Sequence, residues 1–264
     1  MSEIGEGPVR QEHIVSYTIE GKNGQQYPAK FFRVDGQVGQ APESSLAKLS
    51  PQIVDVAKRC FTNWTDDGAR FARILSERAN RVSVVFDPKG ERVVAFNLYE
   101  QGQVTPEGVD GPVDFVYTHY AGVEPQATEA GETFRSAGLM EKSRTHDTGA
   151  MNPDVISGCT ANGAILRGVR TTAKELDRVM YPDPDVAVSA PIVATGRAIY
   201  GRVNGDEAAR SVDNSLIRHG ASPYVRGSAP DPLVDKLPTQ NDAILYASVS
   251  KGFAARLHST PVRR

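Results

Sequence analysis

Residues 111–140 read GPVDFVYTHYAGVEPQATEAGETFRSAGLM, and this stretch decides the fold. Its first part, up to Val123, is a run of β-branched and aromatic residues of strand length. A loop opens at Pro125, and apolar residues at helical spacing predict a helix from near Gly131. A strand that runs through a tight loop into a helix leaves several backbone N–H groups without partners, and such a place attracts phosphate. The stretch therefore predicts a site for a phosphate-bearing ligand; the alternative is an ordinary strand-to-helix connection.

Upstream of this stretch, the sequence predicts two hairpins with two helices between them. The second hairpin turns at Asp87-Pro88-Lys89-Gly90, where the proline and the glycine suit a tight turn. Ser50-Pro51 is expected to begin the first helix, as a cap followed by a first-turn proline, after a loop over 35–50. The expected strands are residues 13–20, 27–34, 82–86 and 93–99.

Downstream, the predicted elements become weaker after a proline-rich YPDP segment at 181–184. Before it, residues 154–157 predict a short strand, and residues 160–170 predict a loop that enters a helix. After it, the expected elements are strands at 186–193 and 197–203, a helix at 207–219, an extended loop at 220–241 and a last strand at 243–250.

The order of elements predicts an α/β (α+β) fold, with a mixed, mostly antiparallel central sheet flanked by helices. Crossover helices need parallel neighbouring strands, whereas the hairpins need antiparallel ones, and one mixed sheet contains both. We expect residues 1–12 to be disordered and residues 13–264 to form a single domain. Its core would span about 50–181, and an irregular C-terminal elaboration would follow over 182–264.

The composition argues against several classes of partner. The formal net charge is −2, which gives no basic footprint for nucleic acid. No apolar run approaches the roughly 20 residues that a membrane span needs, and the polar N-terminus does not resemble a secretory signal. Two cysteines about 100 residues apart argue against a disulfide framework and favour a reducing compartment. These features predict a cytoplasmic protein that binds neither nucleic acid nor membranes.

The order of elements and two local segments together resemble the GNAT superfamily of acetyl-CoA-dependent N-acyltransferases. THYAGVEPQATEAGE (118–132) resembles the fourth strand of that family with its bulge and its pyrophosphate loop. SGCTANGAILRGV (157–169) resembles the fifth strand and the Thr-x-Asn turn into the next helix. The resemblance covers about residues 50–181 and implies a GNAT-like fold that uses acetyl-CoA as a cosubstrate.

The resemblance also implies a set of cofactor-binding residues. The family's loop usually reads Arg/Gln-x-x-Gly-x-Gly/Ala; aligned from Pro125, its glycine matches Gly131, while Thr128 and Thr133 depart from the pattern. Backbone N–H groups of the loop would hold the pyrophosphate, and that of Val123 would lie at the thioester. Asn162 would contact the acyl-cofactor arm, or would only cap the following helix. The implied loop residues are Glu129, Ala130, Gly131, Glu132 and Thr133.

For catalysis, a GNAT-type reaction needs a base for the amine and an acid for the departing thiolate. His119 and Tyr120 in the fourth strand and Glu100 at the end of the third are the candidate bases, and His119 has the right ordinary pKa range. Tyr181 is the candidate acid, since the helix after Asn162 contains no tyrosine where the family has one. Each of these side chains has a purely structural alternative.

Other chemistries find less support in the sequence. Cys159 with His119 would give a thiol–imidazole pair, but no activating motif surrounds the cysteine. The five histidines show neither H-x-x-x-H nor CxxC spacing, so no metal site is predicted. The leading hypothesis is transfer of an acetyl or other acyl group from acyl-CoA to a small-molecule or peptide amine. The alternative is a non-catalytic GNAT-like binding module that has lost turnover or CoA binding.

Overall fold

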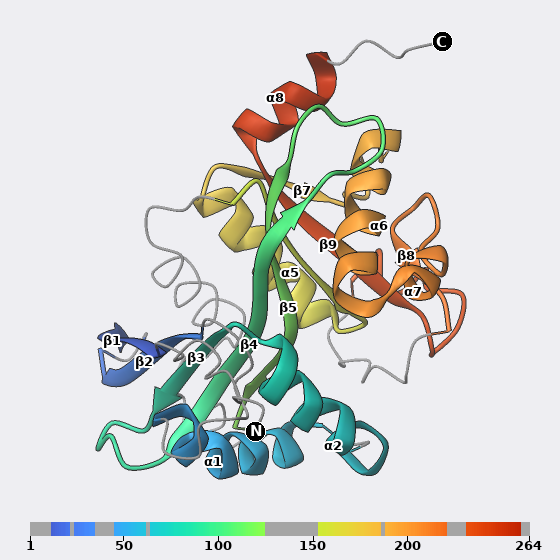
Figure 1. Ribbon diagram of the computed structural model, residues 1–264. Helices are drawn as coiled ribbons and strands as arrows, with labels where there is room; N and C mark the ends of the chain where they lie inside the picture. Colours follow the sequence, from blue (N-terminus) through green and yellow to red (C-terminus); the bar gives the residue numbers. More distant parts are fainter. Residues whose placement is uncertain are drawn as a thin grey trace, which may run out of the picture.

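The computed structural model describes residues 12–21, 24–34, 45–61, 64–124, 153–185, 188–220 and 231–259. Within these ranges the chain forms one sheet of nine strands that is covered by helices (Figure 1). The strands are β1 (Glu12–Glu20), β2 (Gln26–Val34), β3 (Arg81–Phe86), β4 (Val93–Val104), β5 (Val113–Val123), β6 (Val155–Thr160), β7 (Arg178–Tyr181), β8 (Ile217–Arg218) and β9 (Ala243–Ser250). The helices are α1 (Ser45–Cys60), α2 (Trp64–Arg73), the π-helical turn η2 (Ile74–Arg78), α5 (Gly163–Glu175), α6 (Ala190–Asn204), α7 (Asp206–Arg210) and α8 (Lys251–Ser259).

The sheet is mixed and mostly antiparallel, which confirms the predicted fold class. Its strand order is β1-β2-β3-β4-β5-β6-β9-β7, and β8 also pairs with β9. Every pair is antiparallel except β5 with β6, which runs parallel. The succession of a strand, two helices, a hairpin, a long strand, a parallel strand and a helix is GNAT-like. β9 lies between β6 and β7, so the C-terminal segment contributes an interior strand; the boundary predicted at residue 182 stays a prediction.

A β-bulge interrupts the pairing of β4 with β5, as the resemblance implied. Leu98 pairs with Tyr120 and the next residue, Tyr99, pairs with Thr118, so His119 is the extra residue on β5. Side chains alternate between the two faces of a regular strand, and a bulge resets that alternation. Tyr120 shares the face of Leu98, and the ring of His119 contacts that of Tyr117, the partner of Glu100. The bulge therefore places two consecutive side chains, His119 and Tyr120, on the same face.

That face of the sheet is covered by α1, α2 and α6, and α5 covers the opposite face. Phe96 and Leu98 pack in one core cluster with α1 and α2, while Phe115 and Tyr117 pack in a second cluster with α6. On the opposite face, α5 packs with alternate residues of β7 and β9 in a separate cluster. In Figure 1, α1 and α2 lie at the lower end of the sheet and α6 and α7 lie at its right. The bulge of β5 lies between these two groups of helices.

The start of the first helix was predicted wrongly. α1 begins at Ser45, and Pro51 lies inside it instead of in its first turn. Leu46 is completely buried on this added turn, and the Ser50 hydroxyl donates to the Leu46 carbonyl at 3.1 Å. Burial of a leucine is worth about 1.5–3 kcal/mol, which is comparable to the cost of a proline inside a helix.

The two strands predicted after residue 185 are wrong, because α6 occupies most of that segment. Its buried positions recur at helical spacing, and Ser189 precedes it with a proline in the first turn. β-branched residues favour strands locally, but the helical spacing of the buried positions determines the structure here.

The helix predicted at 207–219 is correct only for α7, since the chain then turns into β8. The helix predicted from Gly131 lies outside the described residues. The disorder predicted for residues 1–12 also lies outside them except at Glu12, where it is wrong because Glu12 begins β1 and pairs with Val34.

Gly122 tests the packing of β5 against α1. A Cβ at this position would lie 2.8 Å from Cε1 of Phe96 and 3.1 Å from Sγ of Cys60. We expect Gly122→Ala to lower the free energy of unfolding by about 1–3 kcal/mol, because the buried ring of Phe96 has to move. Gly252→Ala in α8 is the matched control, since nothing lies within 4 Å of its Cβ position. Urea unfolding measures both variants, and equal stabilities would contradict this description of the core.

Candidate functional site

The parallel ladder between β5 and β6 is short, and β5 continues beyond it. The two strands pair from Phe115 with Val155 to Thr118 with Gly158, whereas β5 extends to Val123. The next N–H, that of Glu124, donates to the Val94 carbonyl at 2.8 Å. Hydrogen-bonded and non-hydrogen-bonded residues alternate along an antiparallel pair. The N–H groups of Ala121 and Val123 therefore point away from β4, to the side on which the ladder with β6 has ended.

At the bulge, the main chain is more accessible than the side chain. His119 as a residue is partly exposed, but its side chain is only 2% exposed. The accessible part of this residue is therefore mainly its backbone. A buried imidazole thus lies beside backbone that a ligand can reach.

His119 and Glu100, two of the predicted bases, are brought together by the structure. Nε2 of His119 lies 3.4 Å from Oε2 of Glu100, at the long end of hydrogen bonding, and the Glu100 side chain is 9% exposed. A Glu100 carboxylate can only accept a hydrogen bond, so it selects the tautomer with the proton on Nε2. In that tautomer Nδ1 carries the lone pair and can accept a proton from another molecule.

Burial lowers the pKa of His119 below its ordinary value of 6.5. The hydrogen bond and the charge of Glu100 oppose this shift, and the positive charges of Arg78 and Arg70 add to it. The imidazole is therefore neutral at pH 7, which is the form that a general base requires.

α6 adds a tyrosine to this group that the sequence interpretation missed. The ring of Tyr117 lies 5.3 Å from that of His119 and 6.1 Å from that of Tyr200, between centroids. Tyr200 is buried, and burial raises the pKa of its hydroxyl; the nearby Cys159 raises that pKa further, while Arg218 and Arg70 lower it. Tyr200 is therefore protonated at neutral pH. Its segment had been predicted as a strand, so nothing in the sequence placed it near His119.

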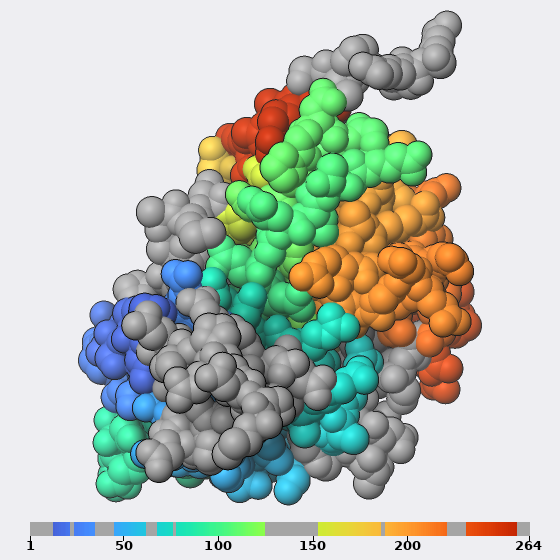
Figure 2. Space-filling model, viewed as in Figure 1, coloured from blue at the N-terminus to red at the C-terminus, as the bar shows by residue number. Residues whose placement is uncertain are grey.

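Two arginines, from α2 and the following turn η2, act on the pair of His119 and Glu100. Arg70 of α2 donates to the Asn204 side chain of α6 at 3.3 Å, which joins the two groups of helices. Figure 2 shows the orange surface of α6 and α7 against the teal surface of α2. Arg78 of η2 also acts electrostatically on His119. The site is therefore a positively charged region between α2, α6 and the bulge of β5.

The other two predicted catalytic residues, Tyr120 and Tyr181, make contacts other than with this pair. The ring of Tyr120 packs against Phe71 and Phe61, with centroids 5.2 and 5.5 Å apart. Tyr181 belongs to β7, and the registers place three strand spacings between it and Tyr117. At the usual spacing these backbones lie about 14 Å apart. The structure therefore does not bring Tyr181 to His119.

Of the predicted cofactor-binding residues, Val123 and Asn162 are described. The Val123 carbonyl accepts a hydrogen bond from Sγ of Cys60 at 3.2 Å, and burial raises the pKa of that thiol to about 11. Asn162 caps α5, because its Oδ1 accepts the N–H of Ala164 at 2.9 Å. Its contact with the acyl-cofactor arm stays a prediction. Glu129, Ala130, Gly131, Glu132 and Thr133 lie outside the described residues.

The end of β5 is held by a buried carboxylate. The Glu124 side chain is 2% exposed and lies 3.1 Å from Nε of Arg59, and it also forms an ion pair with Arg92. The two arginine side chains are 43% and 50% exposed, so losing either one leaves the buried carboxylate with less compensating charge. These contacts fix the direction in which the chain leaves β5 immediately after Val123.

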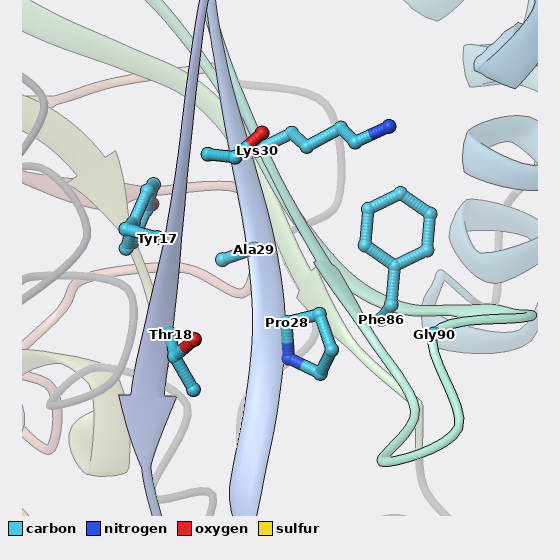
Figure 3. A pocket seen from close by; sticks show the side chains of 8 residues that line it. Tyr17, Thr18, Pro28, Ala29, Lys30, Phe86 and Gly90 are labelled. Carbon is cyan, nitrogen blue, oxygen red and sulfur yellow. The ribbon is translucent and has the colours of Figure 1, made fainter.

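A pocket of about 340 Å³ lies on the outer strands, away from this site. Figure 3 shows the Lys30 side chain extending toward Phe86, and its ammonium lies 5.6 Å from the centroid of that ring. None of the predicted site residues that the structure describes lines this pocket. Among the described residues, no group of three or more His, Cys, Asp or Glu side chains could hold a metal ion. No described helix is long and apolar enough to cross a membrane.

Comparisons with known proteins find only distant likenesses. No family model and no curated protein matches the chain. A GCN5-related N-acetyltransferase from Kribbella flavida matches with a TM-score of 0.33 and 20% identity over 46% of this chain and 29% of that one. NAA60 from Arabidopsis thaliana, in complex with acetyl-CoA, matches with a TM-score of 0.33 and 10% identity over 57% of this chain and 86% of that one.

A GCN5-related N-acetyltransferase from Anabaena variabilis ATCC 29413 matches with a TM-score of 0.39 and 11% identity, over 88% of this chain and 61% of that one. Of the proteins compared, the one from Kribbella flavida is much longer than the matched region, and this chain spans less than a third of it. Likenesses at these TM-scores carry no inference about activity, which has to rest on the geometry of this chain.

The neutral state of His119 predicts a pH dependence of stability. Below pH 6.5 the unfolded chain binds a proton at this residue, whereas the folded chain, with its lowered pKa, does not. The free energy of unfolding therefore falls as the pH drops below 6.5, by at most about 1.4 kcal/mol per pH unit. This contribution should vanish in His119→Gln and persist in His13→Gln, a change on the exposed part of β1. Urea unfolding at pH 7.5 and 5.5 measures it, and an equal loss in all three proteins would show that His119 is not held neutral.

Proposed function

We propose that the protein transfers an acyl group, in the simplest case acetyl, from acyl-CoA to an amine. The observation that carries this proposal is the ladder of β5 and β6, which ends beside a buried, neutral His119. The N–H groups of Ala121 and Val123 point to the side where the ladder has ended, as donors for a thioester carbonyl require. The loop predicted to bind the pyrophosphate, with Gly131, follows directly in the sequence.

In this proposal, the acyl-CoA supplies an activated thioester, and the residues of this chain orient and deprotonate the acceptor. Nδ1 of His119 accepts the first proton of the acceptor's ammonium group, while Glu100 holds the proton on Nε2. The free amine then attacks the carbonyl carbon, the N–C bond forms and the C–S bond breaks. The second amine proton goes to the departing thiolate, so the net reaction releases one proton. Tyr181 has no role in this scheme, because its strand lies too far from β5.

Val123 allows a test of the backbone donor. Val123→Pro removes the N–H without removing a bond to β4, because that N–H points away from β4. We expect this variant to bind acetyl-CoA at least about tenfold more weakly, the equivalent of one hydrogen bond of roughly 1.4 kcal/mol. Val123→Ala keeps the N–H and is the matched control for the lost side chain. Calorimetric titration measures both; equal affinities in folded variants would remove Val123 from the site.

His119 allows a separate test of the chemical step. We expect His119→Gln to lower kcat/KM for acetyl transfer by about 10²- to 10⁴-fold, because the amide cannot accept the proton. Its affinity for acetyl-CoA should stay that of the unaltered protein. Transfer to a panel of small and peptide amines, followed through the released thiol, measures the activity, with His13→Gln as the control. Undiminished transfer in His119→Gln would exclude His119 as the base, and acetyl-CoA binding without transfer to any amine would favour a non-catalytic binding module.

A further inference from the structure

The outer side of β1 is an open edge of the sheet. β1 is the first strand in the strand order, and no described strand pairs with its outer side. Its pairing with β2 runs without a bulge from Glu12 to Glu20, and between these two residues it contains no Asp, Glu, Lys, Arg or Pro. Charges, prolines and bulges are the usual means by which an edge strand avoids pairing with another chain. β1 has none of them along this stretch and is therefore open to strand pairing.

The hydrogen bonds of the hairpin identify the backbone groups that point outward. The Gly21 N–H donates to the Gln25 carbonyl at 2.8 Å, and bonded and non-bonded pairs alternate from there along the two strands. Thr18 falls in a non-bonded pair opposite Pro28, which has no N–H to donate. By the same alternation, the N–H and C=O groups of every second residue of β1 point away from β2. These residues are Glu12, Ile14, Ser16 and Thr18.

Two apolar side chains on this edge are exposed. Ile14 is 41% exposed and Val15 is 47% exposed, and no other large hydrophobic residue in the described part of the chain is exposed. As consecutive residues of a strand, they lie on opposite faces of the sheet. A strand that pairs with this edge therefore covers apolar surface on both faces.

The pocket on the outer strands lies on the same face as Ile14. Ser16 follows Ile14 by two residues and shares its face, and Lys30 is the partner of Ser16 on β2. Ser16, Lys30 and Phe86 all line the pocket. Figure 3 shows Lys30 and Phe86 on one side of the strands and Tyr17 on the other. The pocket therefore borders the outer edge of β1 beside Ser16.

We propose that the outer edge of β1 binds the same edge of a second copy of the chain, so that two sheets become one. A two-fold axis at Val15 pairs Glu12 with Thr18 of the second copy. It also pairs Ile14 with Ser16, and each pair occurs twice across the axis. All four outward-facing residues then exchange backbone hydrogen bonds. Val15 lies opposite Val15 of the second copy in a non-bonded pair, where side chains approach most closely.

The pocket and the charges favour this register and this partner. Ile14 of the second copy lies directly beside Ser16 and covers the pocket from the side of the edge, and the two-fold axis repeats this contact. An axis at Ser16 would place Glu12 opposite Glu20, and like charges directly opposite each other destabilise a sheet. An axis at Ile14 would leave Thr18 without a partner. Because the strand between its two glutamates contains no charged residue, it does not repel its own copy and offers nothing to a charged partner.

The test exchanges charges at the axis, with Val15→Lys and Val15→Glu. The position is exposed, so both variants should fold. Sedimentation equilibrium over micromolar to millimolar concentrations should show a dimer for the unaltered protein and a monomer for each variant, because like charges then face each other. An equimolar mixture of the two should dimerise at least about tenfold more tightly than either alone. Val15→Thr, which stays uncharged and β-branched, is the matched control and should remain a dimer.

Ser16 tests the backbone of the same edge. Ser16→Pro removes an N–H that points outward, so the pairing with β2 is kept. We expect the dimer to weaken at least about tenfold, whereas Ser16→Ala, which keeps the N–H, should dimerise as the unaltered protein does. A protein that stays monomeric at every concentration would overturn the proposal. A dimer that persists in Val15→Lys, or a mixture of the two charged variants that stays monomeric, would overturn it as well.

Discussion

β5 has one residue more than β4 at the point where Leu98 and Tyr99 pair with Tyr120 and Thr118, and the site depends on that extra residue. A strand without the bulge would turn either His119 or Tyr120 to the face of α5. With the bulge, Tyr120 fills the core beneath α2, while His119 lies beside Glu100 and Tyr117. The same short segment contains the end of the parallel ladder with β6. One irregularity thus brings a buried imidazole next to accessible backbone.

α6 completes the site from the other side. It packs on the part of the same face of the sheet that α1 and α2 leave uncovered, and it contributes Tyr200. The hydrogen bond from Arg70 to Asn204 joins it to α2. The segment that contains it runs between two neighbouring strands, β7 and β9, so its position is fixed by the sheet at both ends. The turn into β8 then places Arg218 over Tyr200. β9 and α6, from the C-terminal third of the chain, therefore belong to the same sheet and core as β5.

The sequence predicted most of these strands well, because a run of β-branched and aromatic residues of strand length is a local signal. The two hairpins, β5 and β9 are observed close to their predicted positions. α6 was mispredicted because its valines and isoleucines favour strands locally, whereas burial against β4, β5 and β9 selects the helix. His119 and Glu100 could be named from the sequence, and the pairing of β4 with β5 joins them. Tyr200 and Arg218 could not, since some 80 residues or more separate them from His119 and only the sheet brings them together.

In the proposed reaction, a thioester binds where β5 and β6 part, against the amides of Ala121 and Val123. Amide NMR spectra of the protein, labelled with ¹⁵N on alanine and valine and titrated with acetyl-CoA, test this claim most directly. We expect the amide resonances of Ala121 and Val123 to shift most and to saturate together, while those of Val104 and Val113 at the other end of the β4–β5 pair stay in place. Unchanged resonances of Ala121 and Val123 at saturating acetyl-CoA would contradict it.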